Sequence, residues 1–153
     1  MKRILMALMI GAVAATATQA LAVDEPANVI KYRRSVMKAM AGHAGAIVGV
    51  VKGEVSFVNQ VGAQAEGIHA MSMLIPSLFP KGTSEDSGLD TKALPKIWDD
   101  WSGFQAAAKK LQDESAKLVE VAKSGDVMAI GAQFGNVGKA CGGCHKPYRA
   151  EKK

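Results

Sequence analysis

Residues 126–148, DVMAIGAQFGNVGKACGGCHKPY, combine an apolar stripe of helical period with a compact cluster of cysteine and histidine. Asp126 precedes the stripe as a helix-capping residue, and steps of three and four residues connect the stripe's members. These members are Val127, Ile130, Phe134, Val137, Cys141, Cys144 and Tyr148. Both cysteines therefore lie on the core-facing side of the expected helix.

The cluster itself is Cys141-Gly142-Gly143-Cys144-His145, the Cys-x-x-Cys-His pattern of c-type haem attachment. In a helix, residues at i, i+3 and i+4 share one face, so both thiols and the imidazole point toward the same body. Cys141 and Cys144 can form thioethers with the two haem vinyl groups, and His145 can bind the iron axially. Glycines at 142 and 143 leave room for the porphyrin edge. The sequence predicts one covalent haem c.

Three other interpretations of the cysteine pair are weaker. A thioredoxin-like redox pair is expected beside a βαβ pattern, and none surrounds residue 141. A structural zinc site needs two further ligands at matching spacing, but the chain has no other cysteine and only two other histidines. A disulfide across two residues closes a very small loop and adds little stability.

The N-terminus has the pattern of a secretory signal peptide. Lys2 and Arg3 form a positive start, residues 4–14 are apolar, and Ala20-Leu21-Ala22 is a small-x-small cleavage site. We expect a signal peptide over 1–22, a single mature domain over 23–153, and a periplasmic location. An uncleaved membrane anchor is the alternative, but the apolar stretch is short for a membrane span. No association with the membrane is expected after cleavage.

Composition and charge limit the other function classes. The chain has 19 Lys and Arg against 14 Asp and Glu, a formal charge of +5, and removal of Lys2 and Arg3 lowers this to +3. The lysines do not form a stripe interleaved with aromatic residues, so we expect no nucleic-acid partner. About 131 mature residues are enough for one domain with one core.

Three further segments show helical periodicity. They cover roughly 26–52, 57–75 and 95–123, and a connection rich in glycine and proline spans 76–90. The stripe of the first segment includes Arg33 and Met37, and that of the second begins at Phe57. With residues 126–148, four amphipathic helices predict an all-α fold, an antiparallel four-helix bundle that encloses the haem.

Arg33 is the single charged residue on the stripe of the first helix. An unpaired buried charge costs several kcal/mol, so its position predicts a buried anionic partner. A haem propionate is such a partner, because the guanidinium fork suits a carboxylate. The alternative is an arginine that reaches solvent at the end of the bundle.

Several motifs together resemble those of the class II c-type cytochromes, the cytochromes c′ and their low-spin relatives. They are Lys31-Tyr32-Arg33 followed by Met37, then Leu94-Pro95-Lys96-Ile97-Trp98, and finally Tyr148-Arg149 after the haem motif. The resemblance covers essentially the whole mature chain. It implies a periplasmic helical bundle for electron transfer or nitric oxide binding, with Arg149 near the haem beside His145. Pro147 departs from the pattern and is expected to break or kink the last turn.

Met37 determines which of two functions we expect. It lies one helical turn after Arg33, so an arginine that binds a propionate places the methionine near the iron, opposite His145. With Met37 as sixth ligand, the protein is a one-electron carrier for periplasmic redox partner proteins and not an enzyme. The alternative is a five-coordinate cytochrome c′-type protein that binds nitric oxide or carbon monoxide, with Met37 crowding the pocket.

Other patterns carry less weight. Glu66-x-x-His69 matches half of a di-iron motif, but the second copy is missing. His69, Met71 and Met73 resemble a copper site, although alternate positions on a helix face different directions, which favours core packing. The glycines at 42, 45 and 49 form a smooth strip on the first helix and predict a homodimer through the first two helices.

Overall fold

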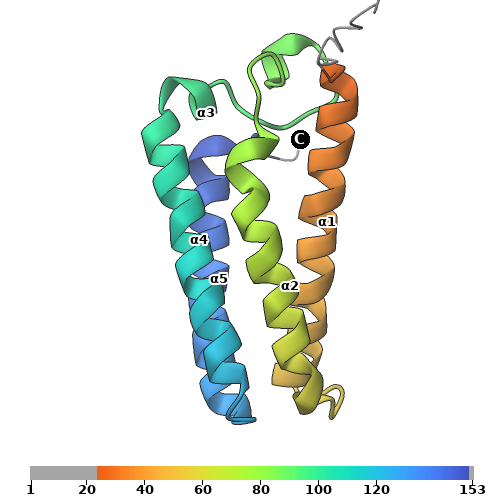
Figure 1. Cartoon of the computed structure of the whole chain (residues 1–153), viewed down its shortest axis with the longest axis vertical. Coiled ribbons are helices and arrows are strands. Elements are labelled where there is room, and N and C mark those ends of the chain that lie inside the picture. Colours follow the sequence, from red (N-terminus) through yellow and green to blue (C-terminus); the bar gives the residue numbers. More distant parts are fainter. Residues whose placement is uncertain (1–23, 152–153) are drawn as a thin grey trace, which may run out of the picture.

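The computed structural model describes residues 24–151, an elongated antiparallel bundle (Figure 1). Its four long helices are α1 (Pro26–Val51), α2 (Val61–Leu74), α4 (Trp101–Ala122) and α5 (Val127–Tyr148). A single-turn helix, α3 (Lys96–Asp99), precedes α4. The predicted four-helix bundle is confirmed, and residues 24–151 contain no β-strand. The predicted signal peptide, 1–22, lies outside the described residues.

α1 matches its predicted span. Pro26 occupies the first turn, where its missing N–H costs nothing, and the chain leaves the helix through Gly53 at φ +71°. The buried face differs slightly from the expected stripe, because Val36 and Val50 are buried whereas Met37 and Val51 are only partly so.

The second and third helices differ more from expectation. Phe57 lies before α2, not on its buried face, and is 53% exposed, because a 3-10 turn at Val58–Gln60 precedes the helix. A second 3-10 turn, Ile75–Leu78, follows α2 because Pro76 has no N–H with which to continue it. The predicted 95–123 helix is interrupted at Asp100, whose backbone (φ −122°, ψ 55°) separates α3 from α4.

α5 includes Pro147 and ends one residue later, at Tyr148. The predicted break of the last turn is therefore not found, and the alternative, a kink, stays a prediction. The proline removes one helical hydrogen bond, but the next one remains, from the Arg149 amide to the His145 carbonyl at 3.0 Å. From outside the helix, the Leu94 amide donates to the Tyr148 carbonyl at 3.1 Å.

The helices of the bundle approach closely at two glycines. A Cβ atom at Gly67 of α2 would lie 2.6 Å from ring atoms of His43 on α1, so that ring occupies the space of a side chain. At Gly131 of α5, a Cβ atom would lie 3.1 Å from Val51 Cγ1 of α1. Gly131 therefore allows α1 and α5 to meet.

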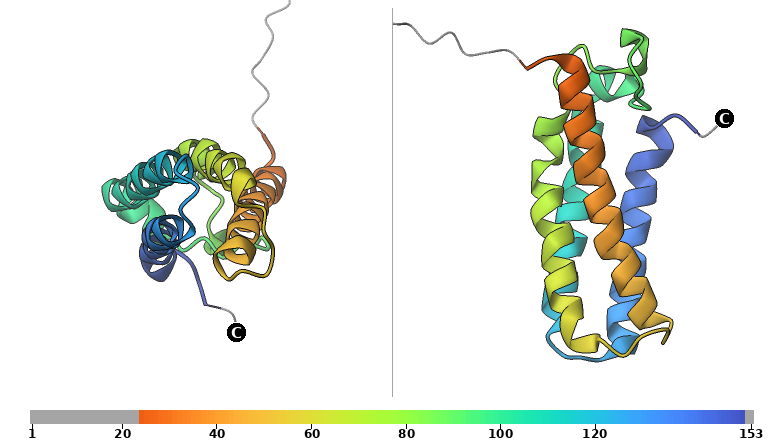
Figure 2. Two further views of the ribbon diagram at one scale, coloured as in Figure 1. Left: turned by 90° about the horizontal axis from the view of Figure 1, so that it is seen from below. Right: turned by 90° about the vertical axis from the view of Figure 1, so that its right-hand side faces the viewer.

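α1 and α5 are not equally close along their length. They come together where α1 ends and α5 begins, and their ribbons diverge toward the other end (Figure 2). We call the region of the Val51–Gly131 contact the far end of the bundle. The motif end contains the first half of α1 and the last turns of α5. No helix within residues 24–151 is long and apolar enough to cross a membrane.

Candidate haem-attachment site

The Cys-x-x-Cys-His motif occupies the last turns of α5. Cys141 and Cys144 are partly buried and pack against the hydrophobic core, and the two thiols are not joined in a disulfide. His145 follows on the same helix and is exposed. The helical spacing expected from the sequence therefore holds at all three residues.

The environment of the thiols disfavours a reactive redox pair. Burial raises the pKa of the Cys141 thiol, and burial together with the neighbouring Cys141 raises that of Cys144 to about 11. Reactive cysteines need the opposite shift, toward the thiolate. No group of three or more His, Cys, Asp or Glu side chains suited to a metal ion occurs in the described part of the chain, which also disfavours structural zinc.

These residues fit a covalent haem. A thioether sulfur is neutral, and it suits a half-buried position in an apolar wall better than a thiolate does. Both cysteines pack against the core from the last turns of α5. This is the end of the bundle at which the ribbons of α1 and α5 diverge (Figure 2). Although His145 as a whole is exposed, its ring is partly desolvated by neighbouring atoms. This desolvation, together with the positive charge of Arg149, lowers the pKa of His145, which favours the neutral imidazole that binds iron.

Met37 lies at the same end of the bundle, on α1. It is half-buried and packs against the hydrophobic core, as both cysteines do. α1 and α5 run antiparallel, so the first half of α1 and the last turns of α5 lie at the same end of the bundle (Figure 1). The structure thus places a thioether and the haem motif on the two diverging helices.

Arg33 is buried, with 4% of its surface exposed, as its place on the stripe predicts. Within residues 24–151, each of its hydrogen-bond partners is a neutral oxygen, and the expected haem propionate stays a prediction. Nη1 donates to Leu78 O at 3.3 Å and to Thr83 Oγ1 at 2.9 Å. Nη2 donates to Thr83 O at 3.0 Å and to Thr91 Oγ1 at 2.8 Å.

These neutral oxygens solvate the guanidinium charge of Arg33, and no acidic side chain within residues 24–151 forms an ion pair with it. Its plane also stacks on Phe79, with Cζ 4.5 Å from the ring centroid. Desolvation lowers the pKa of Arg33 to about 10, still well above neutrality. Both Nη atoms are fully engaged, so Nε–H is the donor that remains for a haem carboxylate.

The connection between α2 and α3 links the two diverging helices. Thr91 accepts a hydrogen bond from Arg33 of α1, and two residues later Ala93 forms an isolated antiparallel bridge with Arg149, just past α5. The Ala150 amide also donates to Lys92 O at 2.9 Å. One segment thus fixes the beginning of α1 and the end of α5 at the motif end.

Arg149 itself is exposed, and its backbone is extended. Its charge is close enough to contribute to the lowered pKa of His145. This effect is consistent with the expectation that Arg149 lies near His145.

The other sequence candidates do not converge on a site. His43 Nδ1 lies 2.7 Å from Gln64 Oε1, and His69 Nδ1 lies 3.1 Å from Ser115 Oγ, so both rings have packing partners between helices. Met71 packs against the core whereas Met73 is 55% exposed, which disfavours a shared copper site.

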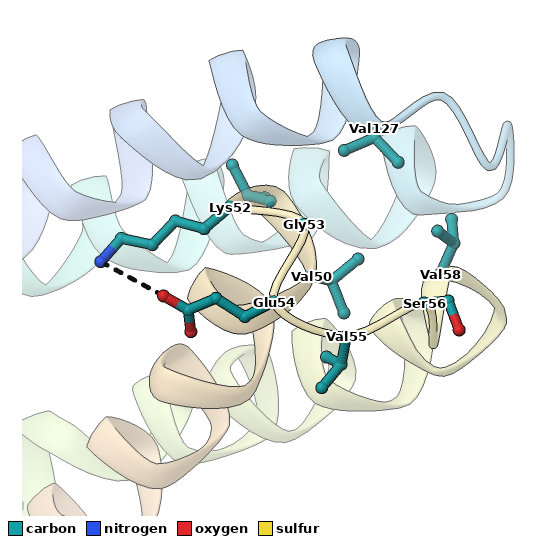
Figure 3. Close-up of a pocket in the computed structure, with 9 residues that line it drawn as sticks. Val50, Lys52, Gly53, Glu54, Val55, Ser56, Val58 and Val127 are labelled. Carbon is teal, nitrogen blue, oxygen red and sulfur yellow. Dashed lines mark ion pairs between the residues drawn. The ribbon is translucent and has the colours of Figure 1, made fainter.

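A shallow hollow lies at the far end of the bundle, away from the motif (Figure 3). Valines from the end of α1, the following loop and the start of α5 form most of its wall. Its charged residues, Lys52 and Glu54, pair with each other at 3.8 Å. We find no chemistry-bearing group there that would compete with the motif.

Thr83, Thr91 and Asp100 belong to none of the motifs or apolar stripes of the sequence. Thr83 and Thr91 lie in an irregular connection whose path no periodicity specifies. Asp100 had a detectable signal, because an aspartate followed three residues later by Gly103 is a capping arrangement, here realised at 3.1 Å.

Comparison with known proteins agrees over nearly the whole chain. Residues 28–149 match the family described as Cytochrome C'. A cytochrome c′ from Rhodospirillum rubrum is 35% identical over 99% of this chain and 100% of its own length. A cytochrome c-556 from Agrobacterium tumefaciens is 32% identical over 82% of this chain and 100% of its own.

A solved structure is similarly close. It is the nitric oxide complex of a cytochrome c prime mutant from Alcaligenes xylosoxidans, with a TM-score of 0.76 and 34% identity. The match covers 86% of this chain and all of that one.

Proposed function

This chain belongs to the cytochrome c′ family and carries one covalently attached haem c, and from that premise we propose that it is an exported one-electron carrier. The haem supplies an iron that changes oxidation state by one electron. Cys141 and Cys144 would hold the macrocycle through thioethers, and His145 would bind the iron. We propose electron transfer rather than catalytic turnover.

The observation that carries this proposal is the half-buried Met37 on α1, which packs against the core at the same end of the bundle as the motif-bearing turns of α5. We propose Met37 as the sixth iron ligand. A methionine–histidine pair raises the reduction potential and blocks outside ligands, both of which suit an electron carrier.

Absorption spectra of the purified holoprotein test this assignment. We expect a low-spin spectrum, and in the oxidised protein a far-red sulfur-to-iron charge-transfer band that Met37→Ala abolishes. Met73→Ala is the matched control, because Met73 is exposed on another helix and the band should survive there. A high-spin wild-type spectrum without this band contradicts the electron-carrier proposal.

The second candidate is binding of a diatomic gas. It is supported by the relative from Alcaligenes xylosoxidans that was solved with nitric oxide bound. In this case Met37 would be a steric gate over a five-coordinate iron. Rapid carbon monoxide binding to the reduced wild-type protein would support gas binding and exclude Met37 as a permanent ligand.

The charges on the two diverging helices favour an acidic redox partner. Neither α1 nor α5 contains an aspartate or glutamate, whereas exposed lysines occur on both, among them Lys38, Lys139 and Lys146. We propose that Arg33 adds a buried positive charge near the haem carboxylates and that Arg149 modulates His145. Electron transfer to an acidic protein should then slow as ionic strength rises.

The location and assembly of the protein are further proposals. We propose export to the periplasm with removal of residues 1–22, which N-terminal sequencing of the periplasmic protein tests. We propose a homodimer through α1 and α2, because a Cβ atom at Gly42 or Gly45 would meet nothing within 4 Å. A monomer in sedimentation at tens of micromolar would contradict the dimer.

A further inference from the structure

The break between α3 and α4 brings one carboxylate to the end of α5. Asp100 caps α4, where its Oδ1 accepts a hydrogen bond from the Gly103 amide at 3.1 Å. Its second oxygen, Oδ2, accepts from the Tyr148 hydroxyl at 2.6 Å. Asp100 therefore connects the first turn of α4 to the last residue of α5.

Gly103 leaves the space in which this hydrogen bond forms. A Cβ atom at position 103 would lie 2.6 Å from the Tyr148 hydroxyl oxygen and 2.6 Å from Asp100 Oδ1. Any side chain at this position would displace one of the two partners. Three residues from two helices and the turn before α4 thus form one interlocked contact.

The tyrosine is fixed by its ring as well as by its hydroxyl. Tyr148 is 6% exposed, and its ring meets Phe104 edge-on at 5.4 Å between centroids. A buried phenol needs a hydrogen-bond partner, and Asp100 supplies it. The same carboxylate raises the pKa of Tyr148 to about 12, so the hydroxyl remains a proton donor at neutral pH.

His145 lies three residues before Tyr148, in the turn that Pro147 deprives of one helical hydrogen bond. That turn is held from outside the helix, by Asp100 and by the Leu94 amide on Tyr148 O at 3.1 Å. We propose that Asp100, Gly103 and Tyr148 form a positioning unit that sets the orientation of the His145 ring toward the haem iron. This inference rests on the proposed role of His145 as an axial ligand.

The test uses the holoprotein and three substitutions that break the same contact from different sides. Tyr148→Phe removes the donor, Gly103→Ala displaces the partners, and Asp100→Asn keeps the cap but removes the second carboxylate oxygen. Two measurements report on the ligand itself, namely the hyperfine-shifted proton resonances of the His145 ring in ferric protein and the reduction potential. Thermal unfolding is recorded alongside them.

We expect all three variants to shift the His145 resonances and the reduction potential in the same direction. The double variant of Tyr148→Phe with Gly103→Ala should shift them no further than either single variant, because the shared contact is already lost. Tyr32→Phe and Gly62→Ala are the controls and should leave both readouts unchanged. Tyr32 is 59% exposed, and a Cβ atom at Gly62, in the first turn of α2, would meet nothing within 4 Å.

Lower thermal stability with unchanged resonances and potential would overturn the proposal, since the contact would then be structural only. Shifts in different directions among the three variants would overturn it too. The readout follows His145 whether or not Met37 binds the iron. Failure of the electron-carrier proposal is therefore visible separately, in the wild-type absorption spectrum.

Discussion

The two ends of the α1–α5 pair differ in how closely the two helices approach. At the far end, Gly131 has no side chain, and the two helices meet at Val51. At the motif end the helices diverge, and the residues there include a half-buried methionine and two half-buried thiols (Figure 2). A contact that closes one end allows the other to stay apart without loss of the bundle. At the motif end the two helices are joined indirectly, through the connection before α3, which contacts Arg33 of α1 and the residues just past α5.

Removal of both cysteines of the motif should have the largest effect on the motif end. Cys141→Ala with Cys144→Ala should leave little stable holoprotein, because the motif end then lacks the group that fills it. Measurement of haem content and helicity in the exported fraction checks this. A double variant as helical and heat-resistant as the wild type would show that the motif end packs without haem.

Loss of Arg33 should have the next largest effect. Arg33→Ala leaves buried acceptors on Leu78, Thr83 and Thr91 without their donor and should destabilise the fold by about 3 kcal/mol. Arg33→Lys should not rescue it, since an ammonium cannot reproduce the planar fork. Denaturant unfolding provides the measurement.

Arg34→Ala is the matched control for that substitution. Arg34 is exposed and pairs with exposed Asp90, so its loss should cost less than about 1 kcal/mol. If Arg33→Ala and Arg34→Ala lower the free energy of unfolding equally, Arg33 does not hold the connection between α2 and α3 at the motif end.

The far end can be tested by overpacking. Gly131→Val should push against Val51 and destabilise the protein by about 1–3 kcal/mol. Gly135→Val, one turn later where a Cβ atom meets nothing within 4 Å, should be nearly neutral. Indistinguishable melting temperatures for the two variants would mean that α1 and α5 do not meet closely at the far end.

A smaller effect is expected from pH. Glu114 of α4 is 5% exposed and accepts hydrogen bonds from Gln133 of α5 at 2.8 Å and from Lys117 at 3.2 Å, and it pairs with Lys110 at 2.8 Å. These partners lower its pKa from an ordinary 4.5 to about 2. A lowered pKa means that the stabilisation is present above pH 4.5 and is lost as pH falls toward 2.

Glu114→Gln should remove this acid-dependent loss of stability, and Glu120→Gln serves as its exposed control. Urea midpoints between pH 5 and pH 2 give the measurement. If the wild type and Glu114→Gln lose stability in parallel over that range, the contribution of Glu114 is absent.

The sequence predicted the parts of this molecule that depend on local periodicity. The spans of α1 and α5 and the shared face of Cys141 and Cys144 follow from steps of three and four residues, and all are confirmed. The continuous helix predicted over 95–123 was wrong at Asp100, where the local capping signal toward Gly103 had not been used. The second contact of Asp100, with the Tyr148 hydroxyl, joins residues that are 48 positions apart. Local patterns contain no information on such a partner.

The site shows the same limit at Arg33. Its burial follows from its position on the apolar stripe, and this is what the structure shows. The oxygens that accept its hydrogen bonds belong to Leu78, Thr83 and Thr91, which lie 45 to 58 residues away in an irregular segment. A sequence shows that Arg33 needs partners, but it does not show where a loop carbonyl or hydroxyl will lie, so these three residues could not be predicted.

The packing of His43 against Gly67 has a consequence for how this sequence can diverge. A methyl group at position 67 would overlap the imidazole where it now lies, so the ring of His43 must move or be replaced before position 67 gains a side chain. A mutational scan of position 67 should tolerate alanine and larger residues better in a background where position 43 is small. The order of substitutions in a lineage would then be constrained, with position 43 shrinking before position 67 grows.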